Sequence, residues 1–337
     1  MTMHSSVGHA HGKIILSGEH AVLYGSPALL APINRFCRCH IEKNITASPK
    51  DLIFKFEGQT YHLSWNDVKA NCRRIEASYQ AYLNEKFLKQ PICNTPLDFL
   101  SIALKKIADV FPELLNHTYV ITVSSDITMK IGLGSSAAIT IALLQAFIQL
   151  YQLTITETGF HQLARSIESY QHGQSSGMDI AACTLPQAIV FENQQAHEYP
   201  LADHLPFRFI NTGMAEDTTG QAIAHAAKHW KNHYLGEFKQ VTNSMLQALA
   251  NQAYDQVHLD IRKNHRLLCA LGVVPEPIQV YIHSLESQGF SAKICGSGSS
   301  TGQSAGLVLV FGPDNQRPLT LANGYHLEDF QLLSRHR

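Results

Sequence analysis

The sequence predicts an α+β fold in two domains, and three observations support this prediction. Segments with strand-like alternation and segments with helical spacing follow one another without strict alternation, which favours α+β over a doubly wound parallel sheet. The 337 residues correspond to two domains of roughly 150 residues each. Hydrophobic residues make up 45% of the chain and charged residues 16%, which supplies enough apolar side chains for two buried cores.

The first 125 residues contain most of the predicted strands. Alternating or β-branched residues predict strands over 13–16, 36–42, 52–61 and 119–124. The segment 52–61 is typical of a hairpin that turns at Glu57-Gly58. Between these strands, apolar residues on one face predict a helix over 96–110.

The middle and the C-terminal part of the chain contain the longer helices. A long apolar helix follows the glycine- and serine-rich segment 131–136, and the next helix begins after Thr154 or Thr156 and ends at Gly173. The strand 207–212 opens a second domain, so we expect domains over 1–205 and 206–337. This second domain contains helical spacing over 221–271 and 275–288 and strands over 292–295 and 305–311.

The composition excludes several classes of function. A formal net charge of −1 gives no broad positive surface for nucleic acid. The seven cysteines are scattered without a C-x-x-C pair, so neither a disulfide framework nor a zinc ribbon is expected. The longest apolar run, 137–153, contains three glutamines and is short for a membrane span. The N-terminus does not resemble a secretory signal, so we expect a cytoplasmic protein without a membrane partner.

The segment 132–137, Gly-Leu-Gly-Ser-Ser-Ala, is a candidate for binding a phosphate chain. Its glycines let the backbone approach a ligand, and the following helix offers unpaired N–H groups and the positive end of its dipole. The two serine hydroxyls suit a helix cap, a phosphate or a metal, and a plain glycine turn with a serine cap explains them equally well. The chain has no Walker-type G-x-x-x-x-G-K-[ST] and lacks the H-R-D and D-F-G motifs of protein kinases.

Two acidic residues, a lysine and a second glycine-rich segment are further candidates. Asp179 follows a glycine- and serine-rich loop, where a carboxylate can act as a base, and Glu168 lies near the end of the preceding helix. A turn-capping Asp179 and a solvated Glu168 are the alternatives. Lys13 follows Gly12 and has the context of an ordinary surface lysine. The segment 293–302 is either a turn or a place where backbone N–H groups meet a ligand.

Together, these segments resemble the GHMP small-molecule kinases, a family that includes galactokinase, homoserine kinase, mevalonate kinase and phosphomevalonate kinase. The opening GKIILSGEHAVLYGSPAL, residues 12–29, looks most like that of the mevalonate kinases. GLGSSAA at 132–138 is a close match, and HGQSSGMD at 172–179 resembles H-G-x-P-S-G-x-D. The chain departs from the family where His11 and Ser175 replace Pro, at 128–131, which lacks the usual prolines and glycines, and at 296–302, where serine and threonine replace glycines.

The resemblance implies a function and a set of site residues. The implied fold has two α+β domains with the active site in the cleft between them, and the implied reaction is ATP-dependent phosphorylation of the 5-hydroxyl of mevalonate. The ATP phosphates would be bound by Lys130, Gly132, Leu133, Gly134, Ser135, Ser136 and Ala137. Mg²⁺ would be bound by Ser136 and Glu168. Asp179 would accept the hydroxyl proton beside Lys13, and Glu19, His20 and Thr218 would lie on the substrate side.

Two alternatives remain open at this stage. The first is another GHMP kinase of small alcohols, such as phosphomevalonate kinase, and the second is a non-catalytic ligand sensor with this fold. The joint presence of Lys13, Ser136, Glu168 and Asp179 favours an enzyme over a sensor. The expected partners are the small molecules mevalonate and ATP, and a homodimer is compatible with the sequence.

Overall fold

The computed structural model describes residues 4–43, 52–85, 92–202, 205–312 and 318–333. The chain forms two compact units, unit 1 with residues 1–12, 35–127 and 135–184 and unit 2 with residues 13–34, 128–134 and 185–337. Each unit mixes helices with a sheet, which confirms the α+β prediction. Both units are assembled from several segments, whereas the sequence places one boundary between residues 205 and 206. The position of a domain boundary there stays a prediction.

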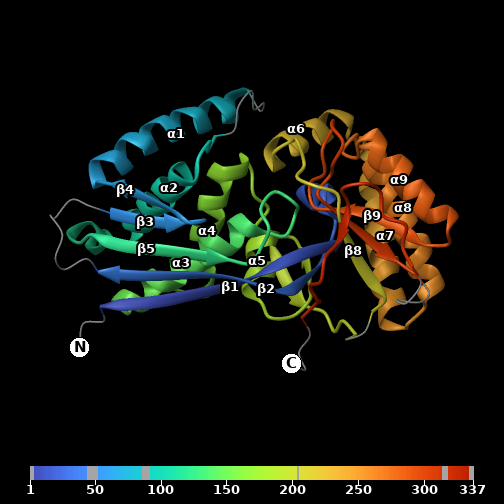
Figure 1. The fold of residues 1–337 in the computed structure, drawn as a ribbon, viewed down its shortest axis with the longest axis horizontal. Coiled ribbons are helices and arrows are strands. Elements are labelled where there is room, and N and C mark those ends of the chain that lie inside the picture. The colour runs from blue at the N-terminus through green and yellow to red at the C-terminus, as the bar shows by residue number, and fades with distance from the viewer. Residues whose placement is uncertain (1–3, 44–51, 86–91, 203–204, 313–317, 334–337) are drawn as a thin grey trace. The chain divides into compact units, whose positions relative to one another are not determined.

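Unit 1 is built on a mixed sheet. Its strands are β3 (Leu52–Phe56), β4 (Gln59–Leu63) and β5 (Tyr119–Ser125), together with the unit 1 parts of β1 (Ser5–Ser17) and β2 (Ala28–Lys43). The order is β4-β3-β5-β2, with β1 also paired to β2, and β3 runs parallel to β5 (Figure 1). The predicted hairpin is confirmed: β3 and β4 are joined by Glu57 and Gly58, both in the left-handed backbone region that tight hairpin turns require.

Five α-helices are described in unit 1, and the long apolar one packs on the sheet. They are α1 (Trp65–Glu85), α2 (Pro96–Val110), α3 (Ser135–Tyr151), α4 (Glu157–His172) and α5 (Met178–Thr184), with a short 3₁₀ helix η2 (Pro112–Asn116) after α2. The ring of Phe147 on α3 meets Tyr119 of β5 edge to face at a centroid distance of 5.2 Å. Thr156 caps α4 and Gly173 ends it, which confirms the second of the two predicted caps.

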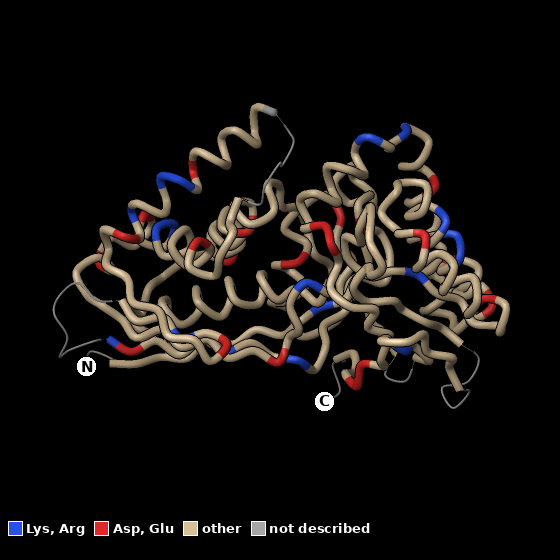
Figure 2. The backbone as a smooth tube through the Cα atoms, turned by 45° about the horizontal axis from the view of Figure 1, so that its top comes forward, with Lys and Arg blue, Asp and Glu red and all other residues tan. Residues whose placement is uncertain are grey.

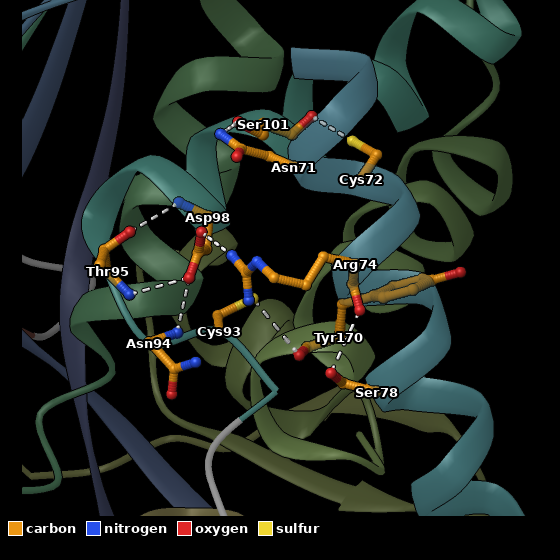
Figure 3. A network of polar contacts seen from close by, with 10 residues as sticks. All are labelled: Asn71, Cys72, Arg74, Ser78, Cys93, Asn94, Thr95, Asp98, Ser101 and Tyr170. Carbon is orange, nitrogen blue, oxygen red and sulfur yellow. Dashed lines mark hydrogen bonds and ion pairs between the residues drawn. The ribbon is translucent and has the colours of Figure 1, made fainter. Parts of the chain in front are cut away.

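A polar network joins α1, α2 and α4 (Figure 3). The Thr95 hydroxyl accepts a hydrogen bond from the Asp98 N–H, and Asp98 Oδ2 accepts one from the Thr95 N–H, each at 3.2 Å. The other carboxylate oxygen of Asp98 pairs with Arg74 of α1. Cys93 Sγ donates to the carbonyl of Tyr170 on α4 at 3.6 Å. This capping box and its neighbours therefore fix the start of α2 and the last turn of α4.

Helix α1 is absent from the sequence-based prediction. Its buried side chains, Val68, Cys72, Ile75 and Tyr82, recur at intervals that place them on one face. Charged and small polar residues separate them, and the stripe contains a cysteine and a tyrosine in place of aliphatic residues. The periodicity is therefore the signal that indicates this helix, since its average hydropathy does not.

Unit 2 contains an antiparallel sheet covered by helices. The sheet has the order β11 (His326–Leu327), β8 (Phe207–Asn211), β10 (Leu307–Phe311), β9 (Ser291–Cys295). The predicted helical region 221–271 contains α6 (Thr219–His229), α7 (Asn232–Ala250) and α8 (Tyr254–Ala270), and α9 (Glu276–Ser287) follows. Helices α8 and α9 pack on β9, and the core buries Phe238 and Phe290 completely (Figure 1). The hairpin β6 (Ile189–Glu192) and β7 (Gln195–Glu198) pairs with residues 28–30 of β2.

Charged residues occur in both units, and five of the seven cysteines belong to unit 1. Lysines and arginines are scattered along the backbone tube among the aspartates and glutamates (Figure 2). All seven cysteines are free thiols, and all except Cys269 are buried. Within the described residues, we find no helix with the length and apolar character needed to cross a membrane.

Candidate active site

The predicted phosphate loop adopts a backbone that only glycine accommodates at its centre. In unit 2, Gly132 has φ +94°, and a Cβ placed on it would lie 2.8 Å from the carbonyl oxygen of Cys295. A Cβ on Gly296, which has φ +88°, would lie 3.1 Å from the Gly132 Cα. The two glycine-rich loops therefore pack backbone against backbone, which requires glycine on both sides.

Lys13 is attached to the same loop. Its backbone N–H donates to the Leu133 carbonyl at 2.9 Å, and its ammonium donates to the Gly132 carbonyl at 3.1 Å. The residue is only 2% exposed, so it is not the solvated surface lysine that the alternative interpretation describes. Lys130 lies two residues before Gly132, has φ +60° and exposes its side chain. One buried and one exposed cation therefore accompany this loop.

Helix α3 begins immediately after the loop, in unit 1. Its first residue is Ser135, whose hydroxyl oxygen is buried and has no hydrogen-bond partner among the described residues. Buried polar atoms are rarely left unpaired, so this hydroxyl is available to a ligand. The unpaired N–H groups of the first turn face the same end of the helix. A phosphate group fits both features.

A cluster of oxygen atoms lies one turn into α3. The Ser136 hydroxyl donates to Glu168 Oε2 at 3.1 Å, and the Thr140 hydroxyl donates to Oε1 at 3.3 Å. His172 Nε2 lies 3.1 Å from Ser136 Oγ and 3.3 Å from Glu168 Oε2. Glu168 is 1% exposed, so it is not on a solvated helix face. The structure thus brings together the two residues predicted to bind Mg²⁺.

This donor set fits a hard divalent cation. A buried carboxylate and a serine hydroxyl are oxygen ligands of the kind that Mg²⁺ binds together with substrate phosphates and water. Among the residues with assigned positions, no three His, Cys, Asp or Glu side chains converge as a metal cage. A cation at Ser136 and Glu168 would therefore complete its coordination with oxygens from the nucleotide and water.

Asp179 lies in the first turn of α5, in unit 1, and is half-buried. The loop before it is held by Arg165, whose Nε donates to the Ser175 carbonyl at 2.8 Å. The Ser175 hydroxyl accepts a hydrogen bond from the Gly177 N–H at 3.2 Å. These two contacts restrain the loop around Ser175.

The acidic residue of the opening motif is buried in unit 2. Glu19 is 2% exposed, and its Oε1 pairs with the ammonium of Lys293, which is completely buried. Its Oε2 accepts a hydrogen bond from Asn264 at 3.5 Å. Lys293 also donates to the Ile294 carbonyl at 2.8 Å. Both carboxylate oxygens thus hold the loop in place, and direct contact of Glu19 with a substrate stays a prediction.

His20 begins the 3₁₀ helix η1 (His20–Tyr24) and is also buried. Its Nε2 lies 2.9 Å from the Ser297 carbonyl, which can only accept a hydrogen bond. Burial lowers the pKa of His20, although the Ser297 carbonyl and Glu19 oppose that effect. The neutral ring therefore carries its proton on Nε2 and presents Nδ1 as an acceptor. At the other end of η1, Tyr24 stacks on Trp230 at 3.7 Å between centroids.

Thr218 is the N-cap of α6. Its hydroxyl accepts a hydrogen bond from the Gln221 N–H at 3.3 Å, and the Thr218 N–H donates to the Gln221 side-chain oxygen at 2.9 Å. The preceding Asp217 accepts hydrogen bonds from both the N–H and the hydroxyl of Ser300 at 2.6 Å. Thr218 thus has a structural task, and its role on the substrate side stays a prediction.

Four residues that contact the predicted site residues are not among those predicted from the sequence: Thr140, His172, Asn264 and Lys293. Thr140 follows Ser136 by four residues and His172 follows Glu168 by four, so helical spacing is the signal that indicates both. Asn264 and Lys293 lie more than 240 residues from Glu19, and no local pattern connects them.

Known proteins with similar sequences support the interpretation of these motifs. Residues 99–187 match the family described as GHMP kinases N terminal domain. A mevalonate kinase from Archaeoglobus fulgidus is 27% identical over 298 residues, which cover 87% of this chain and 89% of the relative.

Solved structures support the fold over nearly the whole chain. The Methanococcus jannaschii mevalonate kinase superposes with a TM-score of 0.71 at 18% identity, covering 97% of this chain and 98% of the other. A Streptococcus pneumoniae phosphomevalonate kinase in complex with phosphomevalonate and AMPPNP has a TM-score of 0.68 at 13% identity, covering 91% and 92%. The α+β architecture is therefore the one found in these kinases.

Proposed function

We propose that this chain is a GHMP kinase, an enzyme that transfers a phosphoryl group to an alcohol, and that its acceptor is the primary 5-hydroxyl of mevalonate. ATP would be the donor, and the products would be 5-phosphomevalonate and ADP. The observation that carries the proposal is the Ser136–Glu168 contact at 3.1 Å, at the start of the helix that follows the glycine-rich loop. The choice of mevalonate rests on residues 18–22 of the opening motif and on the similarity to mevalonate kinases.

The residues have separate tasks in this reaction. The loop from Gly132 and the start of α3 with Ser135 would bind the ATP phosphates. Ser136 and Glu168 would hold Mg²⁺, which supplies positive charge to the phosphate oxygens when it is bound. In the transfer, the hydroxyl oxygen forms a bond to the γ-phosphorus as the bond to the β,γ-bridging oxygen breaks. Asp179 would accept the hydroxyl proton.

Lys13 would contribute positive charge to the same step. Its ammonium is fixed by the Gly132 carbonyl, so it is already oriented when the nucleotide binds. A preoriented cation stabilises negative charge that develops on the transferred phosphoryl group.

On the substrate side, His20 could contact either the carboxylate or a hydroxyl of mevalonate, and the state of its ring favours the hydroxyl. A neutral ring with the proton on Nε2 has only Nδ1 left for a substrate, and Nδ1 accepts hydrogen bonds. A substrate hydroxyl can donate to Nδ1, whereas a carboxylate cannot. We therefore assign His20 to a hydroxyl of mevalonate, and Glu19 with Lys293 to holding η1 in place.

The experiment is an ADP-release assay over mevalonate, phosphomevalonate, homoserine, galactose and glycerate, with mass spectrometry of the product. Phosphomevalonate is the main competitor, because one of the similar structures is a phosphomevalonate kinase. Turnover of mevalonate at the highest kcat/KM supports the proposal. Preference for another alcohol overturns the substrate, and binding of ATP without turnover of any alcohol indicates a ligand sensor. The proposal includes a cytoplasmic location, which the seven free thiols support.

A further inference from the structure

The carboxylate of Glu168 is buried and therefore needs several partners. In unit 1, Thr140 of α3 donates to Oε1 at 3.3 Å. The other oxygen, Oε2, is shared: Ser136 Oγ lies at 3.1 Å and His172 Nε2 at 3.3 Å. The first carboxylate oxygen thus has its own donor, and the second is the one whose partners can rearrange.

His172 contacts both residues that would bind the cation. It lies one helical turn after Glu168 on the same face of α4, and its Nε2 is 3.1 Å from the hydroxyl of Ser136 on α3. The side chain is 19% exposed. His172 is also the last residue of α4, and the following Gly173 lies directly against the Tyr82 ring of α1. The imidazole is therefore held between two helices beside the oxygen cluster.

The cation changes what the Ser136 hydroxyl must do. That hydroxyl has one proton, which it donates to Glu168 Oε2 in the metal-free arrangement. When Ser136 Oγ and the carboxylate both bind a divalent cation, their lone pairs point to the cation and the hydroxyl proton needs another acceptor. A neutral imidazole protonated on Nδ1 has a lone pair on Nε2, which lies at hydrogen-bond distance from that hydroxyl.

We propose that His172 is a positioning residue of the divalent-cation site. It accepts the hydrogen bond of the Ser136 hydroxyl and thereby leaves Glu168 Oε2 to the cation. This inference rests on the proposed function, which places Mg²⁺ at Ser136 and Glu168. The hydroxyl stays protonated and changes its acceptor, and His172 accepts as the neutral tautomer that carries its proton on Nδ1. Groups that orient metal ligands commonly contribute a factor of roughly 10–100 to metal affinity.

The test measures cation binding instead of turnover. Mn²⁺ replaces Mg²⁺, and free Mn²⁺ is measured by electron paramagnetic resonance in the presence of ADP. His172→Ala is expected to weaken Mn²⁺ binding by roughly 10–100-fold. His172→Gln is expected to stay within about threefold of the unsubstituted protein, because the glutamine side-chain oxygen can accept the same hydrogen bond. Ser169→Ala is the matched control on α4, since that hydroxyl donates to the Arg165 carbonyl of its own helix and interacts with Tyr79 of α1.

Two comparisons separate this inference from the proposed function. Circular dichroism and melting temperature first establish that each variant is folded, and Glu168→Gln provides the reference for a lost ligand. If Glu168→Gln loses Mn²⁺ but His172→Ala binds it normally, or His172→Gln is as weak as His172→Ala, the role of His172 is wrong and the cation site stands. If the unsubstituted protein binds no Mn²⁺ with ADP, the cation site itself is wrong and the role of His172 is wrong with it.

Discussion

The buried pair of Glu19 and Lys293 gives a sharp prediction about stability. Lys293→Met keeps the length of the side chain and removes its charge. The Glu19 carboxylate then stays in the interior of unit 2 with the amide of Asn264, at 3.5 Å, as its remaining side-chain partner. A buried charge that has lost its counter-charge is strongly destabilising, because the protein interior solvates it poorly.

The expected magnitude follows from the burial of both partners. Their side chains are 0% and 1% exposed, so solvent does not screen the loss. Removing one partner of such a pair costs about 3–5 kcal/mol, which for a unit of this size lowers the melting temperature by roughly 6–20 °C. Glu19→Gln/Lys293→Met removes both charges and is expected to recover a large part of that loss, because neither charge is then left alone.

The assay is thermal unfolding followed by circular dichroism, with urea unfolding as a second measure. Lys263→Met is the control, since the Lys263 ammonium donates to Gln240 at the surface and its charge has only a minor effect on Asp260, and its melting temperature should stay within about 2 °C. The reasoning is refuted if Lys293→Met melts like the control. It is equally refuted if the double variant is no more stable than Lys293→Met.

Three further predictions concern the proposed base, a buried histidine and the cap of α2. Asp179→Asn should lower kcat by roughly 10²–10⁴-fold with little change in KM, and a near-normal kcat contradicts this. Because Asp179 and Lys13 act on one step, the kcat of Asp179→Asn/Lys13→Met should fall by less than the product of the two single losses. Burial and the nearby charges of Lys293 and Arg266 lower the pKa of His265 from 6.5 to about 4. Below pH 6.5 the unfolded chain binds a proton at His265 that the folded chain does not, so the free energy of unfolding should fall by about 2 kcal/mol between pH 7.5 and 5. The melting temperature of His265→Gln should depend less on pH, and a pH dependence equal to that of the unsubstituted protein contradicts the prediction. Asp98→Ala should cost about 1–2 kcal/mol by thermal unfolding, because the N–H groups that it caps lose their acceptor; an unchanged melting temperature contradicts this role.

The parts of the fold that the sequence predicts correctly have local signals. Helix α2 occupies 96–110 as expected, since its apolar face and its first proline mark both the helix and its start. The end of α4 at Gly173 and the hairpin at Glu57-Gly58 are likewise decided by residues within the turn itself. Helix α1 escapes prediction because its buried stripe includes Cys72 and Tyr82 and its other faces are polar.

Some contacts of the candidate site can likewise be predicted from nearby sequence, and others cannot. Ser136 and Glu168 lie on consecutive helices, and the family resemblance predicts a shared role for them before the 3.1 Å contact is seen. Glu19 has the same kind of motif support, but its partner Lys293 is 274 residues away, so its burial cannot be derived from the sequence around it. The role of Thr218 as a helix cap can be predicted from the nearby sequence, because Gln221 follows it by three residues, the spacing of a capping box.

The ratio of kcat/KM for mevalonate to that for phosphomevalonate tests the central claim most directly. Both values are measured on one preparation with saturating ATP and Mg²⁺, and Asp179→Asn provides the background rate. The account predicts a ratio above about 10, which corresponds to at least about 1.4 kcal/mol of preferential transition-state stabilisation. A ratio below about 0.1, or rates for both alcohols equal to the background of Asp179→Asn, contradicts it.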